Sequence, residues 1–256
     1  MLLCAFVEWP EGLDVAAREW DVIRRSVDAA RPDLLVTNEL PFGPWLASAD
    51  ALDVSAAKRS VELHVRGLEA LAALGVPAVI SSRPVWTGTK LANEAFVLEQ
   101  GRAVALHAKH MLPEEPGWRE TTWFEAATGG FEVRTVAGLR VGVLLCTELM
   151  FNERARRYGR EGADLIVVPR ATGTDHSMWR TAAAMAAIVA GSYVVSSNRA
   201  GRGSTGPDFG GGGFAFAPDG ALLASTSPES PLATVRIDLE RSRRQKAEYP
   251  CYVKDA

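Results

Sequence analysis

A cysteine stands at the end of an apolar run in the stretch VGVLLCTELMF, residues 141–151. Thr147 and Glu148 follow Cys146 at once, so the strand that this run predicts ends at the thiol. Free cysteines are among the most buried residue types, and Cys146 could be a packing residue. Alternatively, it is a nucleophile at the rim of a sheet, which requires a microenvironment that one strand alone does not reveal.

Two more predicted strands end in ionisable residues, Glu39 in DLLVTNEL and Lys109 in HAKHMLP. Taken singly, Glu39 could cap a turn and Lys109 could be a solvated surface lysine. Taken with Cys146 they form a chemical set, because a thiol needs a base and a carboxylate can supply one. A lysine ammonium then stabilises the thiolate and the oxyanion that follows its attack. We therefore predict Glu39, Lys109 and Cys146 as catalytic, with the backbone N–H of Thr147 as a second oxyanion donor.

Other chemistries are poorly supported. GRGSTG, residues 201–206, matches G-x-G-x-x-G after a strand, but Pro207 and the glycines at 210–213 follow where a nucleotide site needs a helix. We predict a mobile loop there. None of the four histidines has partners at zinc-ligand spacing, so no metal or cofactor is expected. Asp175 and His176 could orient a group in a cleft, although a surface turn is the favoured interpretation.

Composition limits the class of protein. The 256 residues are 47% hydrophobic and 23% charged, which is typical of a globular chain and compatible with one α/β domain. A net charge of −3 gives no reason to expect nucleic acid or a membrane as partner. Three scattered cysteines form no disulfide framework and favour a reducing, cytoplasmic location. The N-terminus lacks the basic region of a signal peptide, and no apolar run is long enough to span a membrane.

Hydrophobic periodicity predicts strands that alternate with helices, with hairpins between and after them. Helices are expected at 13–30, 53–74, 152–162 and 178–191, and strands at 2–9, 33–39, 76–82, 90–100, 102–110, 164–171 and 192–198, with hairpins in 130–146 and 209–227. This order favours a mixed α/β layered domain with its helices outside. We assign residues 1–240 to that domain and residues 241–256 to a polar tail.

The strand-end residues, in this order, resemble the nitrilase superfamily of carbon–nitrogen hydrolases over nearly the whole chain. The most specific segment runs from the Cys146 strand through the helix at 152–162 to LIVVP. PEEPGWRETTWF, residues 113–124, is similar to the family segment that carries a second glutamate, which places that role on Glu120. SYVVSSNRAG and FGGGGFAFAPDG resemble the closing strands of the family.

The resemblance implies a four-layer α-β-β-α sandwich in one domain, which pairs into homodimers through helical faces, with the tail reaching toward the partner. It also implies hydrolysis of a small linear amide or N-carbamoyl compound through a thioester on the cysteine. Three departures bear on the substrate subgroup: Asn38 where many members have proline, Thr147-Glu148 where an aromatic and Asp are commoner, and Gly213 or a neighbour where serine is frequent.

Two other functions remain open from the sequence. The same residues could hydrolyse nitriles or transfer acyl groups, or the fold could serve as a catalytically silent ligand-binding protein, which would predict loss of one of the three catalytic residues. Aromatic side chains usually line small-molecule pockets, and they also fill cores. The candidates for substrate contact are Trp45, Trp118, Trp123, Phe151, His176 and Trp179.

Overall fold

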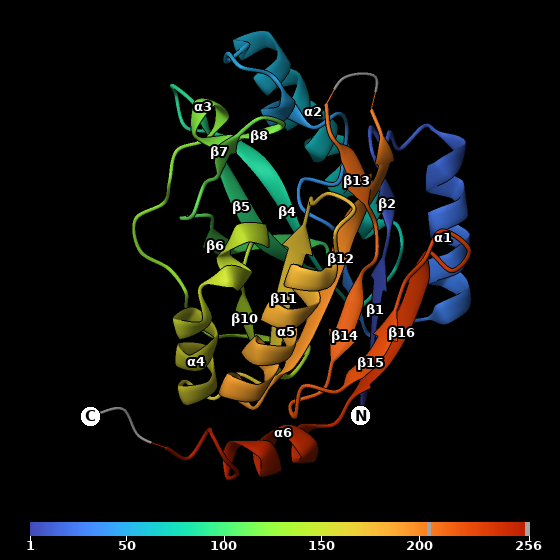
Figure 1. The fold of residues 1–256 in the computed structure, drawn as a ribbon. Coiled ribbons are helices and arrows are strands. Elements are labelled where there is room, and N and C mark those ends of the chain that lie inside the picture. The colour runs from blue at the N-terminus through green and yellow to red at the C-terminus, as the bar shows by residue number, and fades with distance from the viewer. Residues whose placement is uncertain (204–205, 254–256) are drawn as a thin grey trace.

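The computed structural model describes residues 1–203 and 206–253 and consists of two packed sheets with helices on both outer faces (Figure 1). The first sheet has six strands in the order β16-β1-β3-β4-β5-β6. These strands are β1 (Leu2–Val7), β3 (Leu34–Val36), β4 (Ala78–Trp86), β5 (Leu91–Glu99), β6 (Arg102–Ala108) and β16 (Leu232–Ile237). The predicted four-layer sandwich is confirmed.

The second sheet has eight strands, with the path β15-β14-β12-β11-β10-β9 and with β2 and β13 paired to β12. They are β2 (Trp9–Pro10), β9 (Arg134–Val136), β10 (Leu139–Val143), β11 (Leu165–Arg170), β12 (Tyr193–Arg202), β13 (Asp208–Gly210), β14 (Phe214–Phe216) and β15 (Leu222–Ser225). A short hairpin joins β7 (Glu114–Glu115) to β8 (Trp118–Arg119). In the predicted mobile loop at 201–206, residues 204 and 205 lie outside the described residues.

Alternating side chains of the two sheets form the central core. Phe6 and Val36 of the first sheet pack in one buried cluster with Val143 and Val167 of the second. The opposite faces of the same strands bury separate clusters under the helices, as a sheet covered on both sides requires. The strands at the centre of each sheet are therefore continuous apolar runs, which is why the sequence predicted them well.

Helices α1 (Arg18–Ala30) and α2 (Val54–Ala72) cover the first sheet, and α4 (Asn152–Arg160) and α5 (Ser177–Ala190) cover the second (Figure 1). The Asp53 side chain caps α2 by accepting hydrogen bonds from the N–H groups of Ser55 and Ala56. A row of buried alanines lets α5 lie against α4 so closely that a Cβ on Gly159 would sit 2.4 Å from the Ala190 carbonyl oxygen.

The structure adds elements that the sequence analysis did not predict. They are β16, the 3₁₀ turns η1 (Leu46–Ser48) and η2 (Cys146–Met150), the single turn α3 (Glu120–Trp123) and the helix α6 (Leu239–Lys246). The helix predicted at 13–30 begins only at Arg18, because residues 14–17 form a turn. Helix α6 crosses the predicted boundary at residue 240, and residues 254–256 of the predicted tail lie outside the described residues. Among the described residues, no helix is both long enough and apolar enough to cross a membrane.

Candidate active site

The predicted catalytic residues converge at one end of the sandwich. Glu39 lies three residues beyond the end of β3, Lys109 directly follows β6, and Cys146 begins η2 just beyond β10. Strands β3, β4 and β6 run in one direction, as do β10, β11 and β12. Each residue therefore stands where its strand delivers the chain to the same rim, the usual place for a site in a sheet of parallel strands.

Lys109 connects the two glutamates. Its Nζ lies 2.7 Å from Oε1 of Glu39 and 2.8 Å and 2.7 Å from the two carboxylate oxygens of Glu120. All three side chains are completely buried. Burial alone would lower the pKa of Lys109, but the charges of Glu120 and Glu39 outweigh it and raise that pKa, so the lysine is an ammonium.

Neighbouring groups fix the orientation of Glu39. Asn93 Nδ2 donates a hydrogen bond to Glu39 Oε1 over 2.8 Å. The backbone N–H of Glu39 donates to the Arg170 carbonyl oxygen over 3.2 Å. Arg199 donates to the carbonyl oxygen of Leu40, a residue with φ of 47°, and so holds the strained turn after the glutamate. Among the described residues, Oε2 of Glu39 has no hydrogen-bond partner. That oxygen is free to accept a proton.

Cys146 is 3% exposed and adopts a φ of 50°, which is unusual for a residue other than glycine. Its Sγ lies 3.9 Å from the carbonyl oxygen of Ala171, at the end of β11. Burial and the charge of Glu39 raise the pKa of the thiol, while Lys109 acts in the opposite direction. The resting residue is therefore a thiol, and reaction requires a base that removes its proton.

Glu148 fixes the turn that carries the cysteine, a function that the sequence analysis did not assign. Its Oε2 accepts hydrogen bonds from the backbone N–H of Leu145 and from His107 Nε2, each over 2.8 Å. Its Oε1 accepts one from the backbone N–H of His110 over 2.7 Å. Because His110 adjoins Lys109, the buried Glu148 carboxylate connects the turn that carries Cys146 to the end of the strand that precedes Lys109. The sequence signal was an acidic residue two positions after the cysteine.

A cavity of about 160 Å³ opens beside the thiol. Its lining residues are Pro113, Glu115, Trp118, Cys146, Thr147, Ala171, Thr172, Gly173, Met178 and Trp179. Trp118 and Trp179, predicted as substrate contacts, lie on its wall, and Thr147 lies beside the cysteine there. Trp45 and Trp123 are instead in a buried aromatic cluster, where each indole N–H donates to a backbone carbonyl. Neither they nor His176 and Phe151 are among the lining residues.

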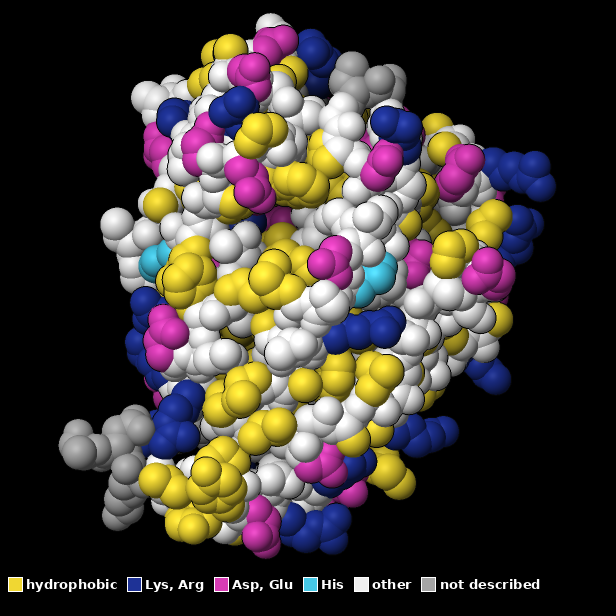
Figure 2. Space-filling model, viewed as in Figure 1, with side chains coloured by type: hydrophobic (Ala, Val, Ile, Leu, Met, Phe, Trp, Pro, Cys, Tyr) yellow, Lys and Arg dark blue, Asp and Glu magenta, His cyan; other side chains and the backbone are white. Residues whose placement is uncertain are grey.

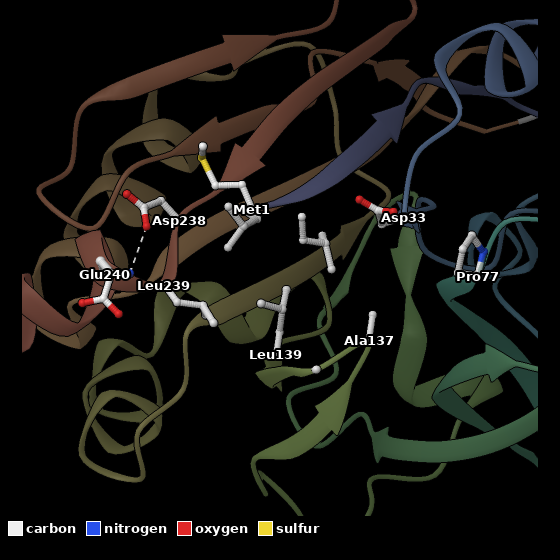
Figure 3. A pocket seen from close by; sticks show the side chains of 11 residues that line it. Met1, Asp33, Pro77, Ala137, Leu139, Asp238, Leu239 and Glu240 are labelled. Atoms are coloured by element: carbon white, nitrogen blue, oxygen red, sulfur yellow. Dashed lines mark hydrogen bonds between the residues drawn. The ribbon is translucent and has the colours of Figure 1, made fainter.

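A second cavity, of about 670 Å³, lies at the opposite end of the strands (Figure 3). Leu2, Asp33 and Leu139 line it where β1, β3 and β10 begin. Its acidic groups are engaged locally, since Asp33 accepts from the Leu3 N–H and Asp238 from the Glu240 N–H. No residue predicted as catalytic lines this cavity, whereas Cys146 lines the smaller one.

Comparison with known proteins agrees with this geometry. The carbon–nitrogen hydrolase family model matches residues 32–247. An (R)-stereoselective amidase from Pseudomonas sp. is 26% identical over 89% of this chain and 80% of its own, and an N-carbamoylputrescine amidase from Arabidopsis thaliana is 25% identical over 91% and 84%. A variant of an amidase from Nesterenkonia sp. AN1, solved with the acetamide moiety of fluoroacetamide on its active-site cysteine, matches with a TM-score of 0.79 at 21% identity, covering 95% of this chain and 92% of its own.

The chain belongs to the carbon–nitrogen hydrolase family, whose model matches most of its length. It is accordingly a hydrolase of carbon–nitrogen bonds other than peptide bonds. The predicted family and enzyme class are confirmed.

The buried glutamate pair generates a prediction about stability. Burial, with the charge of Glu39, raises the pKa of Glu120 from 4.5 to about 8, against the effect of Lys109. The native state then holds a proton that the unfolded chain releases, so this contribution is complete below about pH 4.5 and is lost as pH rises to 8. We expect the melting temperature of Glu120→Gln, relative to the unmodified protein, to rise steadily between pH 5 and pH 8.

Glu114→Gln is the matched control for that measurement. Glu114 is exposed, and hydrogen bonds from Thr121 and Thr122 lower its pKa, so it does not titrate in this range. The difference in melting temperature between Glu114→Gln and the unmodified protein should stay constant with pH. If the melting temperatures of Glu120→Gln and the unmodified protein differ by the same amount at every pH, Glu120 does not hold the proton.

Proposed function

We propose that this enzyme hydrolyses a small linear amide or an N-carbamoyl compound through a thioester on Cys146. The observation that carries the proposal is the contact of Lys109 Nζ with the buried carboxyl groups of Glu39 and Glu120, together with a cavity lined by Cys146 and Thr147. The (R)-stereoselective amidase and the N-carbamoylputrescine amidase to which the chain is similar support this range of substrates.

The reaction begins when Cys146 Sγ attacks the carbonyl carbon and its proton passes to Glu39. The oxyanion that forms is stabilised by the Lys109 ammonium and by the backbone N–H of Thr147. Glu39 returns the proton to the leaving nitrogen, so ammonia or an amine departs and a thioester remains. Glu39 then takes a proton from water as the water attacks the thioester. The carbon–sulfur bond then breaks to release the acid, and Glu39 returns its proton to Sγ and restores the thiol. Glu120 keeps Lys109 in place throughout.

We also propose that the protein forms a homodimer in the cytoplasm. The face of α5 exposes Met178 and Met185, and Tyr249 and Tyr252 after α6 are 74% and 62% exposed. Figure 2 shows hydrophobic side chains gathered over α5 and below it. Exposed apolar area of this kind favours association with a second copy. Three free cysteines fit a reducing compartment. Light scattering of the purified protein measures the assembly's mass, and a monomer would contradict the dimer.

The principal experiment measures ammonia release from a panel of amides, N-carbamoyl amino acids and nitriles. We expect turnover of at least one amide or carbamoyl compound, because the thiol, base and oxyanion donors suit attack on a carbonyl carbon. Intact mass during turnover of a slow substrate should show an acyl adduct on the peptide that contains Cys146. Cys146→Ala should lack both signals, while Cys4→Ala, which alters a buried cysteine of the core, should keep the adduct.

Three results would contradict this proposal. Full turnover by Cys146→Ala would exclude the thioester route. Turnover of nitriles alone would support the alternative chemistry that the same residues permit, and an inert protein that still binds amides would support the silent ligand-binding alternative.

The separate roles of the two glutamates can be tested without a substrate. Iodoacetamide alkylates a thiol at a rate that follows removal of the thiol proton. Glu39→Gln should therefore change the pH profile of alkylation at Cys146 more than Glu120→Gln does, because the charge of Glu39 has the larger effect on the pKa of the thiol. Peptide mapping must separate Cys146 from the half-buried Cys251. A larger effect from Glu120→Gln would mean that the two roles are exchanged.

A further inference from the structure

Thr172 lies on the wall of the catalytic cavity, one residue beyond the carbonyl group that contacts the Cys146 thiol. The residue is 3% exposed and therefore almost completely buried. Two donors already contact that oxygen: Arg170 Nη1 at 3.1 Å and Asn198 Nδ2 at 3.0 Å. The hydroxyl therefore lies in a fixed polar environment immediately beside the reacting group.

The hydrogen-bonding capacity of this hydroxyl is only partly used. A threonine hydroxyl offers two acceptor lone pairs and one O–H donor. Arg170 and Asn198 occupy both lone pairs, and among the described residues the O–H donates to no group. The amide orientation of Asn198 is fixed independently, because its Oδ1 accepts from the Thr172 N–H over 3.0 Å and its Nδ2 donates to the Gly211 carbonyl. The O–H of Thr172 is therefore an unused hydrogen-bond donor in a residue that lines the cavity.

Arg170 strengthens that donor. Its guanidinium is completely buried, and no carboxylate of the described residues forms an ion pair with it. It donates to Ser196 Oγ, Thr172 Oγ1 and the Gly212 carbonyl, and it lies over the rings of Phe214 and Trp179. Burial lowers its pKa to about 9, which leaves it charged at neutral pH. A cation that donates to a hydroxyl oxygen polarises the O–H and makes it a better donor.

We propose that Thr172 determines substrate specificity by donating a hydrogen bond to an acceptor on the acyl part of the substrate, with Arg170 as its positioning residue. The inference rests on the proposed amide hydrolysis and names the substrate class: amides whose acyl chain bears a carbonyl or carboxylate oxygen close to the scissile bond. A buried donor that finds no acceptor discriminates against a purely apolar acyl chain. Glu115, exposed on the same cavity, favours the neutral carbonyl over the carboxylate.

The test compares three amides of similar size: 3-methylbutanamide, malonamide and malonamate. The quantity measured is the ratio of kcat/KM for each acceptor-bearing amide to that for 3-methylbutanamide. The unmodified enzyme should prefer at least one acceptor-bearing amide, and the preferred one distinguishes a carbonyl from a carboxylate partner. Thr172→Val, which keeps the shape but loses the hydroxyl, should lower the preferred ratio by about three- to tenfold, chiefly through KM.

Two further variants separate specificity from structure. Thr172→Ser retains the hydroxyl and should keep the ratio within about twofold of the unmodified enzyme. Thr181→Val makes the same substitution on the exposed side of α5, where the hydroxyl donates to Ser177, and should not change the ratio. A purely structural role for Thr172 would lower kcat/KM for all three amides equally.

The outcomes distinguish failure of this inference from failure of the proposed function. Equal ratios in the unmodified enzyme and Thr172→Val overturn the inference and leave amide hydrolysis intact. If Thr172→Val does not fold, the unmodified enzyme alone still tests the inference. A preference for 3-methylbutanamide over both acceptor-bearing amides would overturn the inference. Absence of turnover and of a Cys146 adduct with every amide tested overturns the proposed function, and this inference with it.

Discussion

A single buried ammonium holds the active end of this molecule together. Lys109 contacts Glu39 and Glu120 at hydrogen-bonding distance, and none of the three side chains reaches solvent. Removing such charges from water is costly unless each is paired and hydrogen-bonded. The strand ends that carry Glu39 and Lys109, and the turn that carries Glu120, must therefore meet within a narrow tolerance. The sandwich places these segments with the required precision because buried side chains pack against both faces of the strands.

The same arrangement explains why the Cys146 thiol requires neighbouring groups in order to react. Burial and the neighbouring carboxylate raise the pKa of Cys146, so the resting site does not hold a free thiolate. Oε2 of Glu39, which has no hydrogen-bond partner in the part of the chain that the structure describes, lies in the same buried cluster of charges. In the proposed mechanism, the thiol proton leaves when a carbonyl group arrives, and Lys109 stabilises the new oxyanion. Attack on the carbonyl group then requires no free cysteine of low pKa, which would also be open to oxidation.

The sequence predicted the parts of the fold that local patterns determine. Continuous apolar runs gave the central strands, and Glu39, Lys109 and Cys146 were found because each interrupts or follows such a run with an ionisable group. Glu120 and the family were predicted from resemblance rather than from periodicity.

Contacts between distant segments were not predicted. Strand β16 was missed because it is only partly buried and completes its sheet only by pairing with β1 at the other end of the chain. Glu148 contacts His107, 41 residues away in the sequence, and Arg170 contacts Gly212, 42 residues away. No local sequence pattern predicts either hydrogen bond. Trp45 and Trp123 were candidates for substrate contact, yet the sequence could not tell an aromatic on the cavity wall, such as Trp118, from one packed behind it.

The most direct test of the account is the turnover of Lys109→Arg, measured beside Lys90→Arg on protein shown by circular dichroism to be folded. A guanidinium keeps the charge, but it is planar and larger than an ammonium and cannot occupy the same point between two carboxylates and an oxyanion. We predict that Lys109→Arg loses at least about 10²-fold in kcat, the usual effect of removing an oxyanion donor. Lys90, whose Nζ donates to the Thr121 carbonyl outside the site, should tolerate the same change. Near-normal turnover by folded Lys109→Arg would contradict the central claim.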